Sequence, residues 1–176
     1  ILMAKAGAEG SRKRTVKERE KYIMSLVNQM TLDEKIGMIH GAGLFRTAGV
    51  PRLGIPELHM SDGPMGVRQE FVDNDWKNVY DSDDTVTYLP SNSAIAATWN
   101  PKRAKECGEV LGAEARGRGK DVILAPGINI KRTQLCGRNF EYMSEDPYLV
   151  SEMTVPLIKG IQKADVAACV KHFAVN

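Results

Sequence analysis

Short apolar runs alternate along the chain with longer stretches in which apolar residues recur every three or four positions. The short runs predict strands at residues 55–62, 93–99, 121–127 and 166–173. The run VILA within 121–127 is the clearest, because it is continuously apolar and ends at Pro126. Strands that alternate with helical patterns favour parallel β-α-β architecture, so we expect an α/β fold.

Helix start signals accompany the patterns between these runs. Thr31 begins a sequence with the spacing of a capping box, and Asn100 stands directly before a proline, as an N-cap residue often does. Pro147 opens a third helical pattern, which continues to residue 164. Pro156 lies inside that pattern, so we expect the helix to kink or restart there.

The spacing of the predicted strands suggests two architectures. Asp62 and Pro126 are 64 positions apart (126 − 62) with one predicted strand between them, so the repeat is about 32 residues, close to one β-α-β unit. Four such strands amount to about half of an eight-stranded barrel, which typically needs about 250 residues. An open doubly wound sheet fits the same pattern, and the spacing does not choose between the two.

Composition and charge narrow the class of protein. The 176 residues are 43% hydrophobic and 26% charged, which is typical of a globular domain. Lysine and arginine number 24 against 22 acidic residues, so no charge excess indicates nucleic acid, a membrane surface or an acidic partner. No apolar run reaches 18 residues, and the first residues lack the pattern of a secretion signal. We therefore expect neither nucleic acid nor a membrane as partner.

The start of the chain and the cysteines add two further expectations. Basic residues crowd positions 11–21, where a solvated arm that leads into a helix is favoured over a nucleic-acid patch. Cys107, Cys136 and Cys169 are widely separated and lack the spacing of a metal site. Free thiols are the favoured interpretation, and they lean toward a reducing, cytoplasmic compartment. Secretion is the alternative if a signal was removed before residue 1.

Charged side chains fall at the carboxyl ends of the predicted strands, where parallel α/β folds bind ligands. Asp62 ends the run 55–62 and precedes a tight glycine-proline loop that leads to Arg68. Lys171 and His172 stand near the end of the last predicted strand, and Arg138 lies on the long loop after residue 127. An acid, several cations and a histidine suit a polyhydroxylated ligand, because charged groups form strong hydrogen bonds with hydroxyls.

Each of these side chains also has a purely structural interpretation. Asp62 is a good turn residue before glycine and proline. Lys171 can extend its ammonium group to solvent, and His172 can be a hydrogen-bonded core residue. Arg138 can pair with Glu141 to hold its own loop. Their coincidence at one end of successive strands favours a shared ligand site.

Other chemistries have no motif in the sequence. Dinucleotide, P-loop, HExxH and GxSxG patterns are absent, so we predict neither a metal nor a cofactor. Trp99 and Phe173 offer flat apolar surface that suits the face of a sugar ring, although core packing is the favoured interpretation of both.

Four motifs taken together resemble one family. They are SDGPMGVR, SNSAIAATWNP, APGINIKRTQLCGRNFEYMSEDPYL and VAACVKHFAVN, in this order. They resemble the N-terminal catalytic domain of glycoside hydrolase family 3, in its β-glucosidase-like branch, over roughly residues 31–176. The resemblance implies a parallel (β/α)8 TIM-type barrel of which this chain supplies the first half. We therefore expect an N-terminal arm and first helix over residues 1–30 and an incomplete barrel domain over residues 31–176.

The resemblance also implies roles for the charged residues. The residues expected to bind the hydroxyls of the sugar at the nonreducing end are Asp62, Arg138, Lys171 and His172, with Arg68 as a further candidate. Family members retain anomeric configuration by means of a carboxylate nucleophile and a separate acid/base carboxylate.

The two catalytic carboxylates are expected outside this sequence. The family nucleophile is an aspartate in a Ser-Asp-Trp type motif, which this chain lacks, and the acid/base comes from a later domain. Glu145 and Asp146 are expected to hold the loop and the start of the following helix. No residue of the segment is therefore assigned as catalytic.

The resemblance implies a retaining β-glycosidase of β-glucosidase or β-xylosidase type, which releases terminal sugars from oligosaccharides or other glycosides. We expect this segment to be inactive alone and to be completed by the remainder of the enzyme, in the same or a separate chain. The alternative is a non-catalytic fragment that binds carbohydrate.

Overall fold

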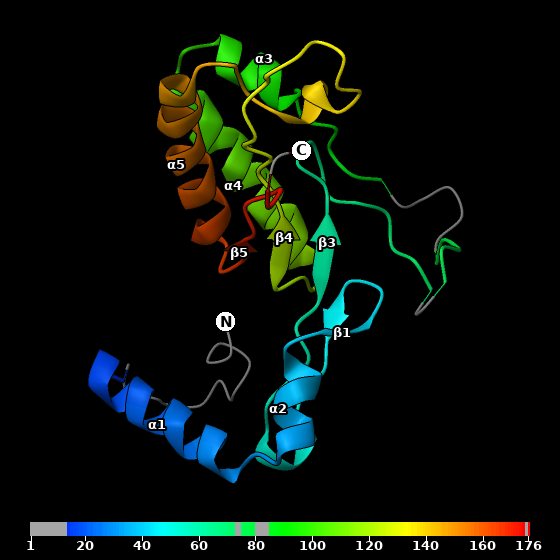
Figure 1. The fold of residues 1–176 in the computed structure, drawn as a ribbon, viewed down its shortest axis with the longest axis vertical. Coiled ribbons are helices and arrows are strands. Elements are labelled where there is room, and N and C mark those ends of the chain that lie inside the picture. Colours follow the sequence, from blue (N-terminus) through cyan, green and yellow to red (C-terminus); the bar gives the residue numbers. More distant parts are fainter. Residues whose placement is uncertain (1–13, 73–74, 80–84, 175) are drawn as a thin grey trace. The chain divides into compact units, whose positions relative to one another are not determined.

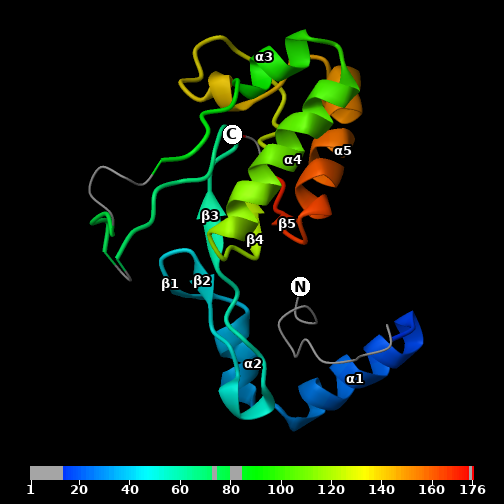
Figure 2. The same cartoon turned by 180° about the vertical axis from the view of Figure 1, so that it is seen from behind.

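The computed structural model describes residues 14–72, 75–79, 85–174 and 176. The chain divides into two compact units, residues 1–58 and 59–176, which are described separately (Figures 1 and 2). The expected basic arm begins outside the described residues, and its second half forms the start of a helix. The expected division at residue 30, into an arm and a barrel domain, stays a prediction.

The first unit is built from short elements, and the two α-helices among them each begin with a capping box. These elements are α1 (Val16–Gln29), α2 (Leu32–Met38), β1 (Gly41–Gly43), β2 (Arg46–Thr47) and the 3-10 helix η1 (Pro51–Leu53). The capping box at the start of α2 is confirmed, because the Glu34 amide donates to Thr31 Oγ1 and the Thr31 amide donates to Glu34 Oε2. Arg52 donates to both carboxylate oxygens of Glu34, at 2.6 and 2.5 Å, and so ties η1 to α2.

The second unit contains a parallel sheet of three short strands. Its elements are β3 (Met60–Asp62), α3 (Asn92–Ala97), α4 (Pro101–Gly117), β4 (Val122–Leu124), the 3-10 helix η2 (Asn139–Glu141), α5 (Pro147–Lys163) and β5 (Ala167–Ala168). The strand order is β3-β4-β5, and Asp62 lies opposite Leu124 while Ile123 lies opposite Ala168. The α/β class expected from the sequence is therefore confirmed.

One predicted strand is wrong. Residues 93–99 lie mostly in helix α3, whose N-cap Ser91 accepts a hydrogen bond from the Ala94 amide. A short apolar run has no period that separates strand from helix, and alanine is the strongest helix former. The crossover from β3 to β4 therefore contains two helices, and the assumed 32-residue repeat does not exist. The other three predicted strands, at 55–62, 121–127 and 166–173, are also shorter than expected.

Helix α5 runs without interruption through Pro156, so the expected restart is wrong, while the alternative of a kink stays a prediction. A proline removes one backbone donor and crowds the preceding turn. Buried side chains lie on both sides of it, among them Met153, Leu157 and Ile161. Packing of this apolar face holds the two halves of the helix in one element.

Helices α4 and α5 lie side by side with their backbones in contact (Figures 1 and 2). A Cβ atom on Gly160 would lie 2.3 Å from the Lys105 carbonyl oxygen, and one on Gly108 would lie 2.1 Å from that of Leu157. A side chain larger than hydrogen cannot fit at either position without moving a backbone. Glycine is therefore required at both positions by helix packing.

We predict that Gly160→Ala lowers the free energy of unfolding by about 1–3 kcal/mol, because the added methyl group overpacks the contact. Gly117→Ala is the matched control, because no atom lies within 4 Å of a Cβ there. Urea denaturation of both variants checks this. Equal stability of the two variants would contradict the backbone contact.

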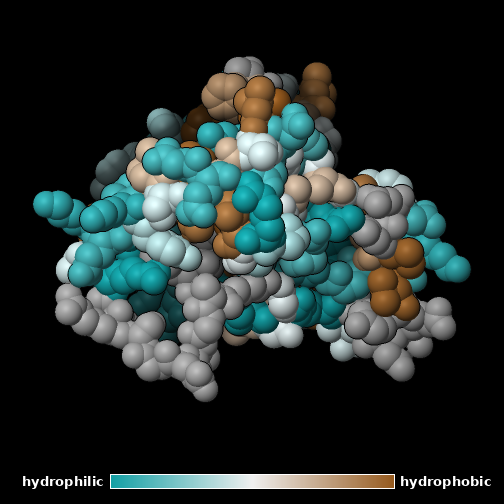
Figure 3. All heavy atoms as spheres, turned by 90° about the horizontal axis from the view of Figure 1, so that it is seen from below, coloured by the Kyte–Doolittle hydropathy of each residue, from teal (hydrophilic) through white to brown (hydrophobic). Residues whose placement is uncertain are grey.

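Several large apolar side chains reach the surface, and Figure 3 shows brown apolar groups among teal polar ones. Trp99 is 68% exposed and Phe173 is fully exposed, so the expected core packing of both is wrong. The three cysteines are free, as predicted. Within the described residues, no helix is long and apolar enough to cross a membrane.

Candidate functional site

The ends of two strands bring an acidic and a basic side chain, Asp62 and Lys171, together. Asp62 is the last residue of β3, and Lys171 follows β5. Lys171 is held by backbone pairing, because its amide donates to the Pro126 carbonyl (3.0 Å) and its carbonyl accepts from the Ile128 amide (2.8 Å). The Lys171 Nζ atom donates to Asp62 Oδ1 at 2.5 Å. Two predicted residues, 109 positions apart, thus form a direct ion pair.

A tight turn brings Arg68 to the other side of Asp62. The Arg68 amide donates to the Asp62 carbonyl at 3.0 Å, and Arg68 Nη1 lies 3.9 Å from Asp62 Oδ2. Gly63 has a φ of 129°, and a Cβ there would lie 1.6 Å from the Gly66 carbonyl oxygen. The turn therefore needs glycine. With Arg68 near Oδ2 and Lys171 at Oδ1, one cation lies near each oxygen of the Asp62 carboxylate.

Arg138 reaches the same cluster from the long loop that follows β4. Its Nε and Nη2 atoms donate to the two oxygens of Glu141 at 2.6 and 2.9 Å. Glu141 Oε2 also lies 3.9 Å from Lys171 Nζ. The Glu141 side chain is only 10% exposed, so it is a buried member of the site. The sequence indicated Glu141 only as a loop partner of Arg138, and it did not indicate its proximity to Lys171.

His172 links Arg138 to the aromatic side chain of Tyr142. Its Nε2 atom lies 2.8 Å from Arg138 Nη2, and its Nδ1 atom lies 2.7 Å from Tyr142 Oη. An arginine can only donate, so Nε2 accepts and the ring proton sits on Nδ1, from which it is donated to Tyr142. The site therefore holds a neutral histidine in one tautomer.

Two asparagines fix this part of the site. Asn129 Oδ1 accepts from the His172 amide at 2.6 Å, and Asn129 Nδ2 donates to the His172 carbonyl at 3.1 Å. Asn176 donates its side-chain amide to Tyr142 Oη. Sequence reasoning missed Tyr142, Asn129 and Asn176, because their roles depend on long-range proximity and not on any local motif.

The surroundings shift the pKa values of the titratable groups. Burial acts to raise the pKa of Asp62, but the hydrogen bond and charge of Lys171, with help from the Gly63 amide and Arg68, hold it below its ordinary value. Burial, Arg138 and Lys171 together lower the pKa of His172. Asp62 is therefore ionised and His172 neutral at pH 7.

We predict that His172→Asn reduces the loss of stability on acidification between about pH 7 and pH 5. The folded pKa of His172 lies below its ordinary value of about 6.5, so the unfolded chain binds the proton first as the pH falls. Stability is thus lost as the pH falls through 6.5 toward the folded pKa, and asparagine removes this contribution. Denaturant unfolding at several pH values measures it. An identical pH slope in both proteins would contradict the lowered pKa of His172.

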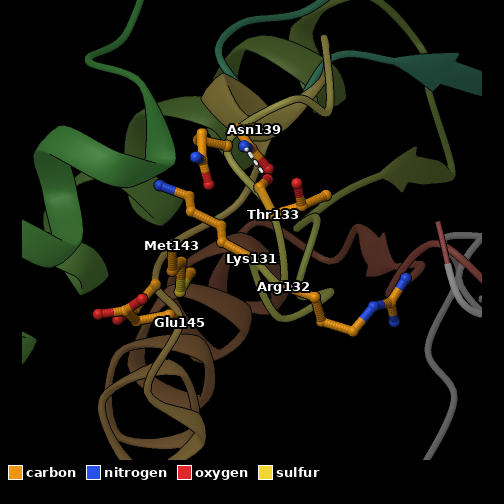
Figure 4. Close-up of a pocket in the computed structure, with 8 residues that line it drawn as sticks. Lys131, Arg132, Thr133, Asn139, Met143 and Glu145 are labelled. Atoms are coloured by element: carbon orange, nitrogen blue, oxygen red, sulfur yellow. Dashed lines mark hydrogen bonds between the residues drawn. The ribbon is translucent and has the colours of Figure 1, made fainter.

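The acidic residues after the loop stand where helix α5 begins. Asp146 Oδ1 accepts from the Tyr148 amide at 2.9 Å, which confirms its expected role at the helix start. Glu145 instead lines a pocket of about 390 Å³ with residues 131–134, 139, 143 and 144. Figure 4 shows Lys131 and Arg132 pointing in opposite directions in this pocket. Lys131 donates to Ser93 Oγ at 2.6 Å, and burial lowers the pKa of Lys131.

The described residues contain no group of three or more histidine, cysteine, aspartate or glutamate side chains that could hold a metal ion. What the cluster offers chemically is hydrogen bonding by fixed charges. Asp62 and Glu141 accept, while Lys171, Arg138 and Arg68 donate.

A parallel α/β fold with a charged cluster beyond its strand ends is typical of proteins that bind a polar ligand at that edge. Residues 58–176 match the glycosyl hydrolase family 3 N terminal domain. The chain belongs to this family.

Known relatives agree with this assignment. The chain is 54% identical to a β-glucosidase of Bacteroides ovatus over 157 residues, which cover 89% of the chain and 21% of that protein. It is 44% identical to thermostable β-glucosidase B of Acetivibrio thermocellus over 154 residues, which cover 88% of the chain and 20% of that protein.

A solved structure shares the fold. The structure of β-glucosidase 3B from Thermotoga neapolitana in complex with α-D-glucose matches 88% of the chain and 23% of that protein, with a TM-score of 0.77 and 40% identity. The chain thus spans about a fifth of the length of the relatives it matches.

Proposed function

We propose that the whole protein is a retaining β-glycosidase of β-glucosidase or β-xylosidase type and that this chain supplies the residues that bind its terminal sugar. The observation that carries the proposal is the ion pair between Lys171 and Asp62, which joins the ends of two strands at the ligand-binding edge of the sheet. Membership of a glycosyl hydrolase family and the names of the relatives support the reaction class.

Asp62, Lys171 and Arg138 suit the recognition of sugar hydroxyls. A hydroxyl both donates and accepts, so it can donate to the Asp62 carboxylate while it accepts from an ammonium or guanidinium group. Hydrogen bonds with a charged partner are about twice as strong as neutral ones. Since these side chains already hold one another, little conformational entropy is lost when the sugar arrives.

We assign His172 and Arg68 to the same site. The two ring nitrogens of His172 bond Arg138 and Tyr142, so contact with a sugar hydroxyl requires one of these bonds to be exchanged. Arg68 stands near Asp62 and supports its ionised form.

The remainder of the enzyme is the expected partner of this segment. We propose that the three parallel strands begin a (β/α)8 TIM-type barrel, preceded by an arm and first helix over residues 1–30, and that both catalytic carboxylates lie outside this chain. A retaining enzyme needs two carboxyl groups about 5–5.5 Å apart across the scissile bond. Asp62 and Glu141 are each paired with cations, an arrangement that suits binding better than nucleophilic attack.

We predict that Asp62→Ala in the full-length protein lowers kcat/KM for a nitrophenyl β-glucoside by about 30-fold to several thousandfold. This range corresponds to about 2–5 kcal/mol for loss of a charged hydrogen-bonding partner. Asp33→Ala, at an exposed aspartate in helix α2, is the control. If Asp62→Ala shows normal kinetics and only a lowered melting temperature, Asp62 is a structural turn residue and does not bind the sugar.

The second candidate function is a non-catalytic carbohydrate-binding fragment, which the pairing of Asp62 and Glu141 with cations favours. We predict that the 176-residue chain alone does not hydrolyse a nitrophenyl β-glucoside, whereas the full-length protein does. Calorimetry with glucose and xylose measures whether the chain alone binds them. Turnover by this chain that Asp62→Ala abolishes would contradict the placement of the catalytic carboxylates elsewhere.

A further inference from the structure

The segment after Arg68 folds back on itself beside the charged cluster. Phe71 pairs with Asn78 in an antiparallel bridge, the Val72 amide donates to the Lys77 carbonyl (2.8 Å), and the Val79 amide donates to the Glu70 carbonyl (3.0 Å). We name the described residues 70–72 and 75–79 the aromatic hairpin. It is a local structure that begins two residues after Arg68.

The aromatic hairpin is fixed at its base to the body of the second unit. Glu70 Oε1 lies 2.5 Å from Lys120 Nζ, just before strand β4. Both side chains are largely buried, with 26% and 12% exposed, so the pair is shielded from solvent. This ion pair connects the hairpin to the same sheet that carries Asp62.

Two rings of the aromatic hairpin contact the guanidinium group of Arg68. Its Cζ atom lies 4.8 Å from the centre of the Phe71 ring and 4.9 Å from that of Trp76, within the range of a cation–π contact. The two rings meet edge to face, with centres 5.4 Å apart. Arg68 thus contacts both aromatic rings while its Nη1 atom lies 3.9 Å from Asp62 Oδ2.

We propose that Phe71 and Trp76 are positioning residues that hold Arg68 in place for sugar binding at Asp62. This inference rests on the proposed function. An arginine side chain loses considerable rotamer freedom when it is ordered, and the two rings impose that order before any ligand binds. Sugar binding therefore does not have to immobilise Arg68. The ordering of Arg68 by the two rings strengthens binding of the ground state and the transition state equally. Loss of a ring is therefore expected to raise KM and to leave kcat unchanged.

The test uses the full-length protein with three substitutions of exposed aromatic residues. Trp76→Leu keeps an apolar side chain but removes the ring, Trp76→Tyr restores an aromatic face, and Tyr148→Leu is the matched control at a similarly exposed aromatic residue. We expect Trp76→Leu to raise both KM for a nitrophenyl β-glucoside and the inhibition constant of glucose by about two- to fivefold, with kcat unchanged. Trp76→Tyr and Tyr148→Leu should remain near the wild type.

The inhibition constant of glucose distinguishes the positioning role from a direct contact between Trp76 and the nitrophenyl group. If KM rises while the inhibition constant stays constant, Trp76 contacts the leaving group and the positioning role is overturned. It is also overturned if Trp76→Leu matches Tyr148→Leu, or if kcat falls together with the melting temperature. Phe71→Leu provides a second variant with the same expected outcome as Trp76→Leu.

Asp62→Ala separates the two proposals. If Asp62→Ala impairs the enzyme and Trp76→Leu does not, only the positioning role fails. If Asp62→Ala leaves the kinetics unchanged, the assignment of the sugar site itself fails, and the positioning role fails with it.

Discussion

The parallel pairing of β3, β4 and β5 is the constraint on which the rest of the second unit depends. Parallel strands end at one edge, so residues far apart in sequence arrive at the same place without any local signal between them. Asp62 ends β3, and Lys171 is fixed by backbone bonds to the segment that follows β4. A shift in the register of β5 by one residue would turn Lys171 away from Asp62. The ion pair is thus a consequence of strand register.

Helices α4 and α5 contact strands β4 and β5, and they approach each other more closely than a side chain larger than hydrogen would allow at the contact. Gly108, Gly112 and Gly160 bring the backbones of α4 and α5 together, and the apolar residues beside them, Leu111 and Ile161, are buried in the core. At its other end α5 is capped by Asp146, after the loop that carries Arg138 and Glu141. The same helix therefore packs against α4 and terminates the loop of the site.

Sequence reasoning succeeded where a local rule determines the structure and failed where distant contacts decide it. The Thr31 capping box and the Asn100 N-cap depend on neighbouring residues, and both are found. The strand predicted at 93–99 is wrong because its short apolar run fits a strand as well as a helix. What favours the helix is burial against the rest of the unit, which Asn92 and Ile95 show. Asn129 and Tyr142 could not be predicted, since their partner His172 lies 30 or more positions away.

The balance of charge in the cluster indicates what kind of ligand it suits. Arg68, Arg138 and Lys171 contribute three positive charges against two negative charges of Asp62 and Glu141, so with a neutral His172 the net charge is +1 (3 − 2). A phosphate or carboxylate ligand would call for unpaired cations, whereas most of these cations are already neutralised. A neutral polyol needs strong donors and acceptors in fixed positions, which paired charges provide without a large field. The rings of Phe71 and Trp76 also suit a ligand that needs donors in fixed positions. As proposed above, they hold Arg68 in place, and they do so without neutralising its charge.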